Sequence, residues 1–258
     1  MSDGPSPTTG RPRTTVLIAQ GRMGSTRLPG KTMMDLGGGP VVDRVLERAS
    51  RAAVDEVVLA CPELAEDDLL AERVSGLGYR VVRGSAQDVL SRYAKAAEES
   101  SAEVVVRVTC DCPLIDPEVI DRVVDAFFEE PLVDYCSNTL ERSYPIGMDC
   151  EVVSREALET ANAEASHPEE REHVTPFLYR RPERFLLRNV KAPEWARRPG
   201  YRLTVDEAAD LELAREVVRR LGADARLRDV VGLLDADAGL RELNAAVGHR
   251  NVEKHLEW

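Results

Sequence analysis

Short apolar runs alternate with helix-like segments along the first part of this chain. These runs lack the apolar-polar alternation of a strand with one wet face, so each indicates a strand that is buried on both faces. Such strands, separated by helices, predict an α/β fold with a mainly parallel sheet and right-handed crossovers, whose ligands bind at the strand carboxyl ends. We expect strands at 16–19, 56–60, 80–82 and 104–108, and helices at 41–51, 64–76 and 88–99.

The segment 20–31 follows the first expected strand and is rich in glycine and cations. Glycines allow sharp turns and close approach of the backbone to a polyanion, hydroxyls donate hydrogen bonds, and cations neutralise charge. The residues that supply these groups are Gly24, Gly30, Ser25, Thr26, Arg22, Arg27 and Lys31. We predict that this loop binds phosphates, as in a nucleoside triphosphate, and the alternative is a surface loop with scattered cations.

This loop matches neither of the two common nucleotide-binding fingerprints. The sequence Gly30-Lys31-Thr32 ends like the phosphate loop of ATPases, but no glycine stands five residues before Gly30. No G-x-G-x-x-G pattern is present either. An ATPase or a dehydrogenase is therefore disfavoured.

Two aspartates, Asp111 and Asp206, each follow a β-like stretch. A carboxylate at a strand end faces the same crevice as the phosphate loop, and Mg²⁺ is usually held by one or two carboxylates plus substrate phosphates. We predict Asp111 as a metal ligand. For Asp206 the residues alone leave two interpretations equally open, a metal ligand or the N-cap of the following helix.

Composition limits the partners and the location of the protein. The chain has 258 residues and a formal net charge of -12, which disfavours nucleic acid and anionic membranes as partners. It contains no apolar run of about 20 residues and no signal peptide, so we expect a cytoplasmic protein. Five cysteines, an odd number, predict free thiols, and Cys110 and Cys112 lack a usual zinc spacing.

We expect residues 1–13 to be a disordered tail and residues 14–258 to form one domain. Segment 131–190 interrupts the alternation, with apolar pieces at 133–136, 149–153 and 185–190 around a helix-like stretch at 169–179. We interpret it as a mixed β/α excursion that closes over the active site. Residues 207–258 are expected to be C-terminal helices, over 206–221 and 227–247, that serve packing or form a dimer surface. The triplet Asp235-Ala236-Asp237 lies there and follows no strand, which disfavours a glycosyltransferase.

Residues 22–31 are similar to R-x-G-S-x-R-L-P-G-K, residues 109–117 to T-G-D-C-P-L-I-D-P, and residues 202–210 to R-W-T-V-D-x-x-x-D. With further blocks at 83–90, 137–140, 144–152 and 170–176, the chain resembles the cytidylyltransferases of the spore-coat polysaccharide biosynthesis branch, over about 14–220. These are related to the sialic-acid and 3-deoxy-manno-octulosonate cytidylyltransferases. Cys110 replaces a glycine and Leu203 a tryptophan. We expect the first to crowd the backbone beside the metal and the second to make the acceptor wall less aromatic.

The resemblance implies a nucleotide-diphospho-sugar transferase fold, a Rossmann-type fold like that of glycosyltransferase-A enzymes. It implies Mg²⁺-dependent transfer of CMP from CTP to an anionic acceptor with release of pyrophosphate. Asp111 and Asp206 would hold the metal, and together with Arg22 and Lys31 they would be the catalytic residues. The residues that would bind CTP are Gln20, Arg22, Gly24, Ser25, Arg27, Lys31, Arg83 and Ser85. Those that would bind the acceptor are Asn138, Asp149, Glu151, Arg171 and His173.

Several of these residues also have purely structural interpretations. Asn138 fits a turn, Arg171 a solvated helix face, and His173 a hydrogen-bonded helix position. Asp88 is expected to cap its helix. His167, His249 and His255 lie in no pattern and receive no role.

Two other functions fit the same residues. One is a nucleotidyltransferase that uses UTP or GTP on a sugar phosphate, and the other is a catalytically silent subunit that binds nucleotide.

We expect CTP and a small anionic acceptor as ligands, and a homodimer formed through 131–190. The dimer is expected because a lone domain would have difficulty burying the apolar residues of this segment. They are Val133, Tyr135, Phe177, Leu178, Phe185 and Leu186.

Overall fold

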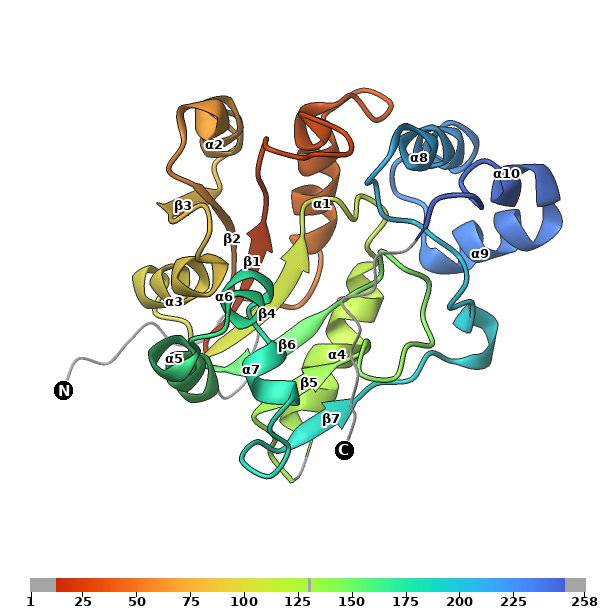
Figure 1. The fold of residues 1–258 in the computed structure, drawn as a ribbon. Coiled ribbons are helices and arrows are strands. Elements are labelled where there is room, and N and C mark those ends of the chain that lie inside the picture. Colours follow the sequence, from red (N-terminus) through yellow and green to blue (C-terminus); the bar gives the residue numbers. More distant parts are fainter. Residues whose placement is uncertain (1–12, 130, 249–258) are drawn as a thin grey trace.

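The computed structural model describes residues 13–129 and 131–248, which build a seven-stranded sheet in the order β3-β2-β1-β4-β6-β5-β7 (Figure 1). The strands β3, β2, β1 and β4 are parallel to one another, β6 runs antiparallel to β4 and β5, and β5 is parallel to β7. The mainly parallel sheet is thus confirmed. The strands are β1 Thr15–Gln20, β2 Glu56–Pro62, β3 Arg80–Gly84, β4 Val104–Thr109, β5 Tyr135–Ser137, β6 Glu151–Ser154 and β7 Leu187–Asn189. The expected tail, apart from Arg13, lies outside the described residues, as do His249 and His255.

Helices cover both faces of the sheet. Leu17 and Ala19 of β1 pack with α1 (Val41–Ala49), α2 (Asp68–Gly76) and α4 (Pro117–Phe128). Val16 and Ile18 point the other way, toward α3 (Val89–Glu99), α5 (Arg155–Glu164) and α7 (Pro176–Tyr179). All four β1 side chains are fully buried, which is why this strand is apolar at consecutive positions.

The C-terminal helices form a separate group beside the sheet, drawn in blue in Figure 1. They are α8 (Ala208–Leu221), α9 (Leu227–Ala236) and α10 (Ala238–Glu242), and they share an apolar cluster with Leu203 and Val205. The helix expected over 227–247 is wrong in extent, because the helix is interrupted at Asp237, between α9 and α10. This side chain accepts a hydrogen bond from the Leu240 N–H and so caps a new helix.

The helix expected at 169–179 is also divided, into α6 (Pro168–His173) and α7. Pro176 begins α7 directly after its N-cap, Thr175, and a proline has no N–H with which to continue a preceding helix. Val174, one residue earlier, has a φ of 72° and ends α6. These two residues turn the chain sharply above the sheet.

Most apolar residues of segment 131–190 are buried within this chain, contrary to the expectation that they would be exposed. Tyr135, Phe177, Leu178 and Phe185 belong to the core, whereas Leu186 is 60% exposed. All five cysteines are buried and free, as expected. No helix within the described residues is long and apolar enough to cross a membrane.

Candidate active site

The loop after β1 is folded around the backbone of Met23. The carbonyl of Met23 accepts hydrogen bonds from Ser25 and Gly30, and its N–H donates to Asp67 Oδ1 at 2.7 Å. Gly30 has a φ of 71°, a conformation that favours glycine, and it leads into a short 3-10 helix, η1 (Lys31–Met33). The loop is therefore a defined structure that presents Lys31 toward the strand ends.

A cleft of about 930 Å³ lies at the carboxyl ends of β1 and β4. This is the place where parallel sheets bind their ligands. The predicted residues that line the cleft are Gln20, Arg22, Ser25, Thr26, Arg27, Lys31, Asp111, His173 and Asp206. All four predicted catalytic residues are thus brought together.

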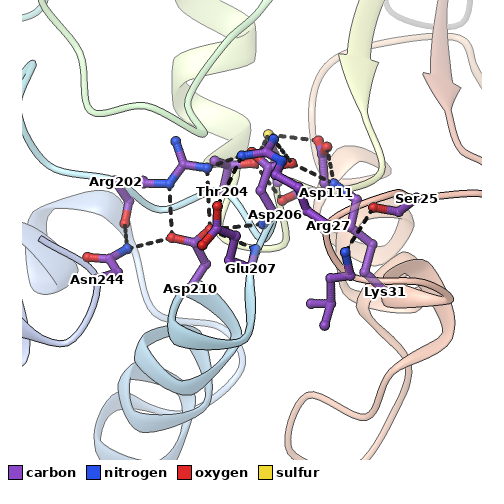
Figure 2. A network of polar contacts seen from close by, with 12 residues as sticks. Ser25, Arg27, Lys31, Asp111, Arg202, Thr204, Asp206, Glu207, Asp210 and Asn244 are labelled. Atoms are coloured by element: carbon purple, nitrogen blue, oxygen red, sulfur yellow. Dashed lines mark hydrogen bonds and ion pairs between the residues drawn. The ribbon is translucent and has the colours of Figure 1, made fainter. Parts of the chain in front are cut away.

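The ammonium group of Lys31 stands between the two predicted metal carboxylates. Its Nζ lies 2.7 Å from Asp111 Oδ2 and 2.8 Å from Asp206 Oδ1 (Figure 2). Asp206 Oδ1 also lies 2.9 Å from Arg27, and Asp206 Oδ2 accepts a hydrogen bond from Arg202 at 2.6 Å. One cation thus bridges two carboxylates that are far apart in the sequence.

Backbone contacts fix these carboxylates side by side. The Val205 N–H donates to the carbonyl of Asp111 at 2.7 Å, and the Thr204 hydroxyl donates to the same carbonyl at 3.0 Å. Gly147 packs against the other side of this segment with a φ of 97°. A Cβ at Gly147 would lie 2.7 Å from the Leu203 carbonyl carbon, so only glycine fits there.

Asp206 is not the N-cap of α8, so the capping interpretation is wrong. The cap is Glu207, and Asp210 accepts hydrogen bonds from the N–H groups of both Asp206 and Glu207 at 3.0 Å. Arg202 joins this group through Asp210 Oδ1 at 2.9 Å (Figure 2). Arg202 received no role from the sequence, although it opens the same motif as Asp206.

The opposite charges shift the pKa values of this group. Burial lowers the pKa of Lys31, but Asp111 and Asp206 outweigh it and raise the pKa above its usual value. Burial likewise raises the pKa of Asp206, and Lys31, Arg27 and Arg202 together bring it below its usual value. The ammonium and this carboxylate are therefore both charged at neutral pH.

Four of the five predicted acceptor residues do not line the cleft. Asn138 is buried and uses its amide to bind the Met148 carbonyl and the Cys150 N–H, as a turn residue would. The carboxylate of Asp149 is paired at both oxygens with Arg142. The polar groups of these two residues hold the chain itself, and their contact with the acceptor stays a prediction.

Glu151 and Arg171 are likewise engaged elsewhere. Glu151 is buried and pairs with Arg107 of β4. Arg171 binds both oxygens of Asp88, and the Asp88 side chain also caps α3 as predicted, by accepting the Ser91 N–H at 2.9 Å. Neither residue lines the cleft, and their contact with the acceptor stays a prediction.

Three predicted CTP residues also lie off the cleft lining. Arg83 donates to the carbonyls of Pro62 and Leu64 and pairs with Asp68, and Ser85 accepts the Asp88 N–H. Gly24 faces Glu66, whose Oε1 would lie 2.7 Å from an added Cβ. Contact of Arg83 and Ser85 with cytosine stays a prediction.

Sequence reasoning missed the wall that α6 and α7 add to the cleft. Glu169, Glu172 and Arg180 line it beside His173, and Arg180 pairs with Glu169 at 2.9 Å. Burial is the main cause that lowers the pKa of His173 below its usual value. The block E-R-E-H at 170–173 is the sequence signal for this wall. From it the sequence favoured Arg171, whose side chain instead pairs with Asp88 at the start of α3.

The two departures from the motifs lie in different surroundings, because Cys110 lines the cleft and Leu203 does not. Cys110 packs against Gly21, where a Cβ would lie only 3.0 Å from the Cys110 sulfur. Leu203 is buried in the C-terminal core and does not line the cleft, so the expectation of a less aromatic acceptor wall is wrong. Neither residue displaces Lys31, Asp111 or Asp206.

The cytidylyltransferase family model matches residues 16–234. The chain belongs to this family. It is therefore a nucleotidyltransferase. It is 33% identical over 228 residues to the spore coat polysaccharide biosynthesis protein SpsF of Bacillus subtilis, and the aligned region covers 85% of this chain and 93% of that protein. The structure of a cytidylyltransferase from Leptospira borgpetersenii is similar with a TM-score of 0.84 and 31% identity, over 89% of this chain and 97% of that one. A 3-deoxy-manno-octulosonate cytidylyltransferase of Geobacter sulfurreducens is 40% identical over 119 residues, 45% of this chain and 46% of that protein.

Proposed function

We propose that this cytidylyltransferase transfers CMP from CTP to an oxygen of a small anionic acceptor, with Mg²⁺ and with release of pyrophosphate. The observation that carries the proposal is the bridge at the strand ends, where Lys31 lies 2.7 Å from Asp111 and 2.8 Å from Asp206. Cations that can neutralise phosphates and carboxylates that can hold a metal thus meet at one point of a 930 Å³ cleft.

The donor set fits a magnesium ion that is shared with the substrate. The described residues contain no group of three or more His, Cys, Asp and Glu side chains that could hold a metal alone. Asp111 and Asp206 already bracket one cation, and Mg²⁺ is usually held by one or two carboxylates together with substrate phosphates and water. When bound, the ion would supply positive charge at the α-phosphate.

The chain's own cations would bind the other phosphates. Lys31 and Arg27 pair with Asp206 in the structure, and Arg22 lines the same cleft. On binding of CTP we propose that Lys31 and Arg27 exchange their carboxylate partners for the β- and γ-phosphates. They would then stabilise the negative charge that develops on the departing pyrophosphate.

The wall of α6 and α7 would face the acceptor. Arg180 supplies a positive charge to this wall. Its ion pair with Glu169 is only partly buried, so breaking the pair costs little free energy. An anionic group on the acceptor would take the place of Glu169. Arg171, which the sequence favoured as the anion clamp, keeps its contacts to Asp88.

Pyrophosphate release tests the proposal. The enzyme with Mg²⁺ is given each of the four nucleoside triphosphates, together with a panel of sugar acids, phosphonates and sugar phosphates. We expect release with CTP and a sugar acid or phosphonate, and none from Asp111→Asn. Release with UTP or GTP and a sugar phosphate would support the alternative transferase. Tight CTP binding without release from any acceptor would support a silent nucleotide-binding subunit.

We also propose that the protein is a homodimer formed through segment 131–190. The support is the open edge of β7, where Leu186 is 60% exposed and Leu132 is 43% exposed. Light scattering should give about twice the 28.5 kDa of one chain, and Leu186→Lys should shift the mass toward one chain. A wild-type mass of one chain at micromolar concentration would contradict the dimer.

A further inference from the structure

A buried ion pair lies directly beneath the cleft. Arg107 of β4 and Glu151 of β6 face each other in the antiparallel register and form an ion pair. Their side chains are 16% and 7% exposed, respectively. Such a pair needs further hydrogen bonds to offset the loss of hydration, so its other partners indicate what it serves.

The partners of this pair lead to two residues of the cleft. Arg107 donates a second hydrogen bond, to Gln20 Oε1 at 3.3 Å, and Gln20 lines the cleft at the end of β1. Glu151 Oε1 accepts a hydrogen bond from the Thr175 hydroxyl at 2.8 Å, and Thr175 follows the turn that carries His173. One buried pair thus contacts Gln20 of the cleft lining and Thr175, which lies two residues after His173 of the same lining.

The turn between His173 and Thr175 is strained. Val174 has a φ of 72° and a ψ of -56°, and the Thr175 N–H donates to the His173 carbonyl at 2.9 Å. These values and this hydrogen bond define a γ-turn of the rare, strained kind, which is especially unfavourable for a β-branched residue. Strained backbone persists only where surrounding contacts hold it, and it gathers at functional sites.

We propose that Arg107, Glu151 and Thr175 are positioning residues that hold His173 in the cleft wall by fixing this turn. The inference rests on the proposed function, because it takes the α6 wall as the acceptor side. Glu151 acts through Thr175 and does not touch the acceptor itself. This role replaces the direct acceptor contact that the sequence predicted for Glu151.

Three substitutions, at two residues that donate to the same oxygen of Glu151, separate positioning from general stability. Thr175→Val keeps the branched shape and removes the hydroxyl, and Thr175→Ser keeps the hydroxyl. Tyr135→Phe is the matched control, since the Tyr135 hydroxyl also donates to Glu151 Oε1 but comes from β5, away from the cleft lining. Steady-state kinetics are measured with CTP and with the best acceptor of the panel above.

We expect Thr175→Val to raise KM for that acceptor about tenfold, with KM for CTP unchanged, because one hydrogen bond that fixes the wall is lost. Thr175→Ser should restore the wild-type value, and Tyr135→Phe should leave both KM values unchanged even if it lowers the melting temperature. An equal rise of both KM values, or the same acceptor defect in Tyr135→Phe, would overturn the proposal.

Proton NMR of His173 tests the positioning without any acceptor. The chain has four histidines, so the imidazole signal of His173 can be assigned by its loss in His173→Gln. Burial holds the pKa of His173 below its usual value, and we expect Thr175→Val to move it upward as the turn loosens, while Thr175→Ser does not. An unchanged His173 titration in Thr175→Val would overturn the inference, whereas a missing pyrophosphate signal in the wild type would count against the proposed function alone.

Discussion

The two halves of the sheet use their polar side chains in different ways. At the parallel half, Lys31 and Asp111 stand at strand ends, line the cleft and pair mainly with other residues around it. At the antiparallel half, Asp149 and Glu151 pair with Arg142 and Arg107, which do not line the cleft. Arg171, on α6 above α3, likewise pairs with Asp88 outside the cleft lining. A charged residue within a family motif can therefore pair with another part of the chain and lie outside the lining of the cleft.

The largest expected effect compares aspartates of the two halves. Asp111→Asn and Asp206→Asn should each lower kcat by about 10²-fold or more, because a carboxylate that holds the metal is lost. Asp149→Asn is the matched control and should stay within about threefold, since its charge serves Arg142. Kinetics with CTP and the best acceptor measure all three. A loss of 10²-fold in Asp149→Asn would mean that the antiparallel half also contributes charge to the reaction.

The second prediction concerns the cation that occupies the carboxylate pair. Lys31→Met should strengthen binding of Mn²⁺ in the absence of CTP by about tenfold, since the ammonium no longer competes for Asp111 and Asp206. The raised pKa keeps Lys31 charged at neutral pH, and its stabilising pairs are lost only as the pH rises through that pKa. The difference in Mn²⁺ affinity between the wild type and Lys31→Met should thus be constant around pH 7. Electron paramagnetic resonance of free Mn²⁺ gives the affinity.

Lys191→Met provides the control for this measurement. Lys191 is an exposed lysine of the other half that pairs with Glu141 at 2.7 Å. It should not change the affinity for Mn²⁺. Equal affinities in wild type and Lys31→Met, with normal binding once CTP is added, would show that the lysine does not compete with the metal.

The smallest expected effect concerns Arg171. Arg171→Gln should lower the free energy of unfolding by about 1 kcal/mol, because it breaks a half-buried pair that joins α6 to α3, and should change kcat by no more than about twofold. Arg184→Gln, which breaks a more exposed pair with Glu164, should cost less. Urea unfolding compares them. A large fall in kcat without loss of stability would support the acceptor-binding role that the sequence predicted for Arg171.

The fold and the reacting groups could be predicted because their signals are local. Consecutive apolar residues at 16–19 indicate a strand buried on both faces, and the glycines and cations that follow predict a phosphate-binding loop. Asp111 was placed at the cleft by one further rule, the position of ligands at strand ends. These inferences needed no knowledge of which segments pack together.

The acceptor side could not be predicted in the same way. Asn138, Asp149, Glu151 and Arg171 have residue types that suit a ligand, and their motifs match the family. Whether such a group faces a ligand or another part of the chain depends on the partner across the fold. Arg171 and Asp88, for example, are 83 positions apart and meet only because α6 packs on α3.

The sequence by itself determined the alternating α/β architecture and the carboxylate of Asp111 after a strand, and it predicted the phosphate-type loop. The β-like stretch expected before Asp206 forms no strand but a single bridge, between Ile146 and Arg202. Only the tertiary structure decided that Asp206 is no helix cap, that Lys31 lies between Asp206 and Asp111, and that Glu151 is buried. The reason is physical. Strand and turn preferences arise from neighbouring residues, whereas the partner of a charge is whichever group the packed chain brings within about 3 Å of it.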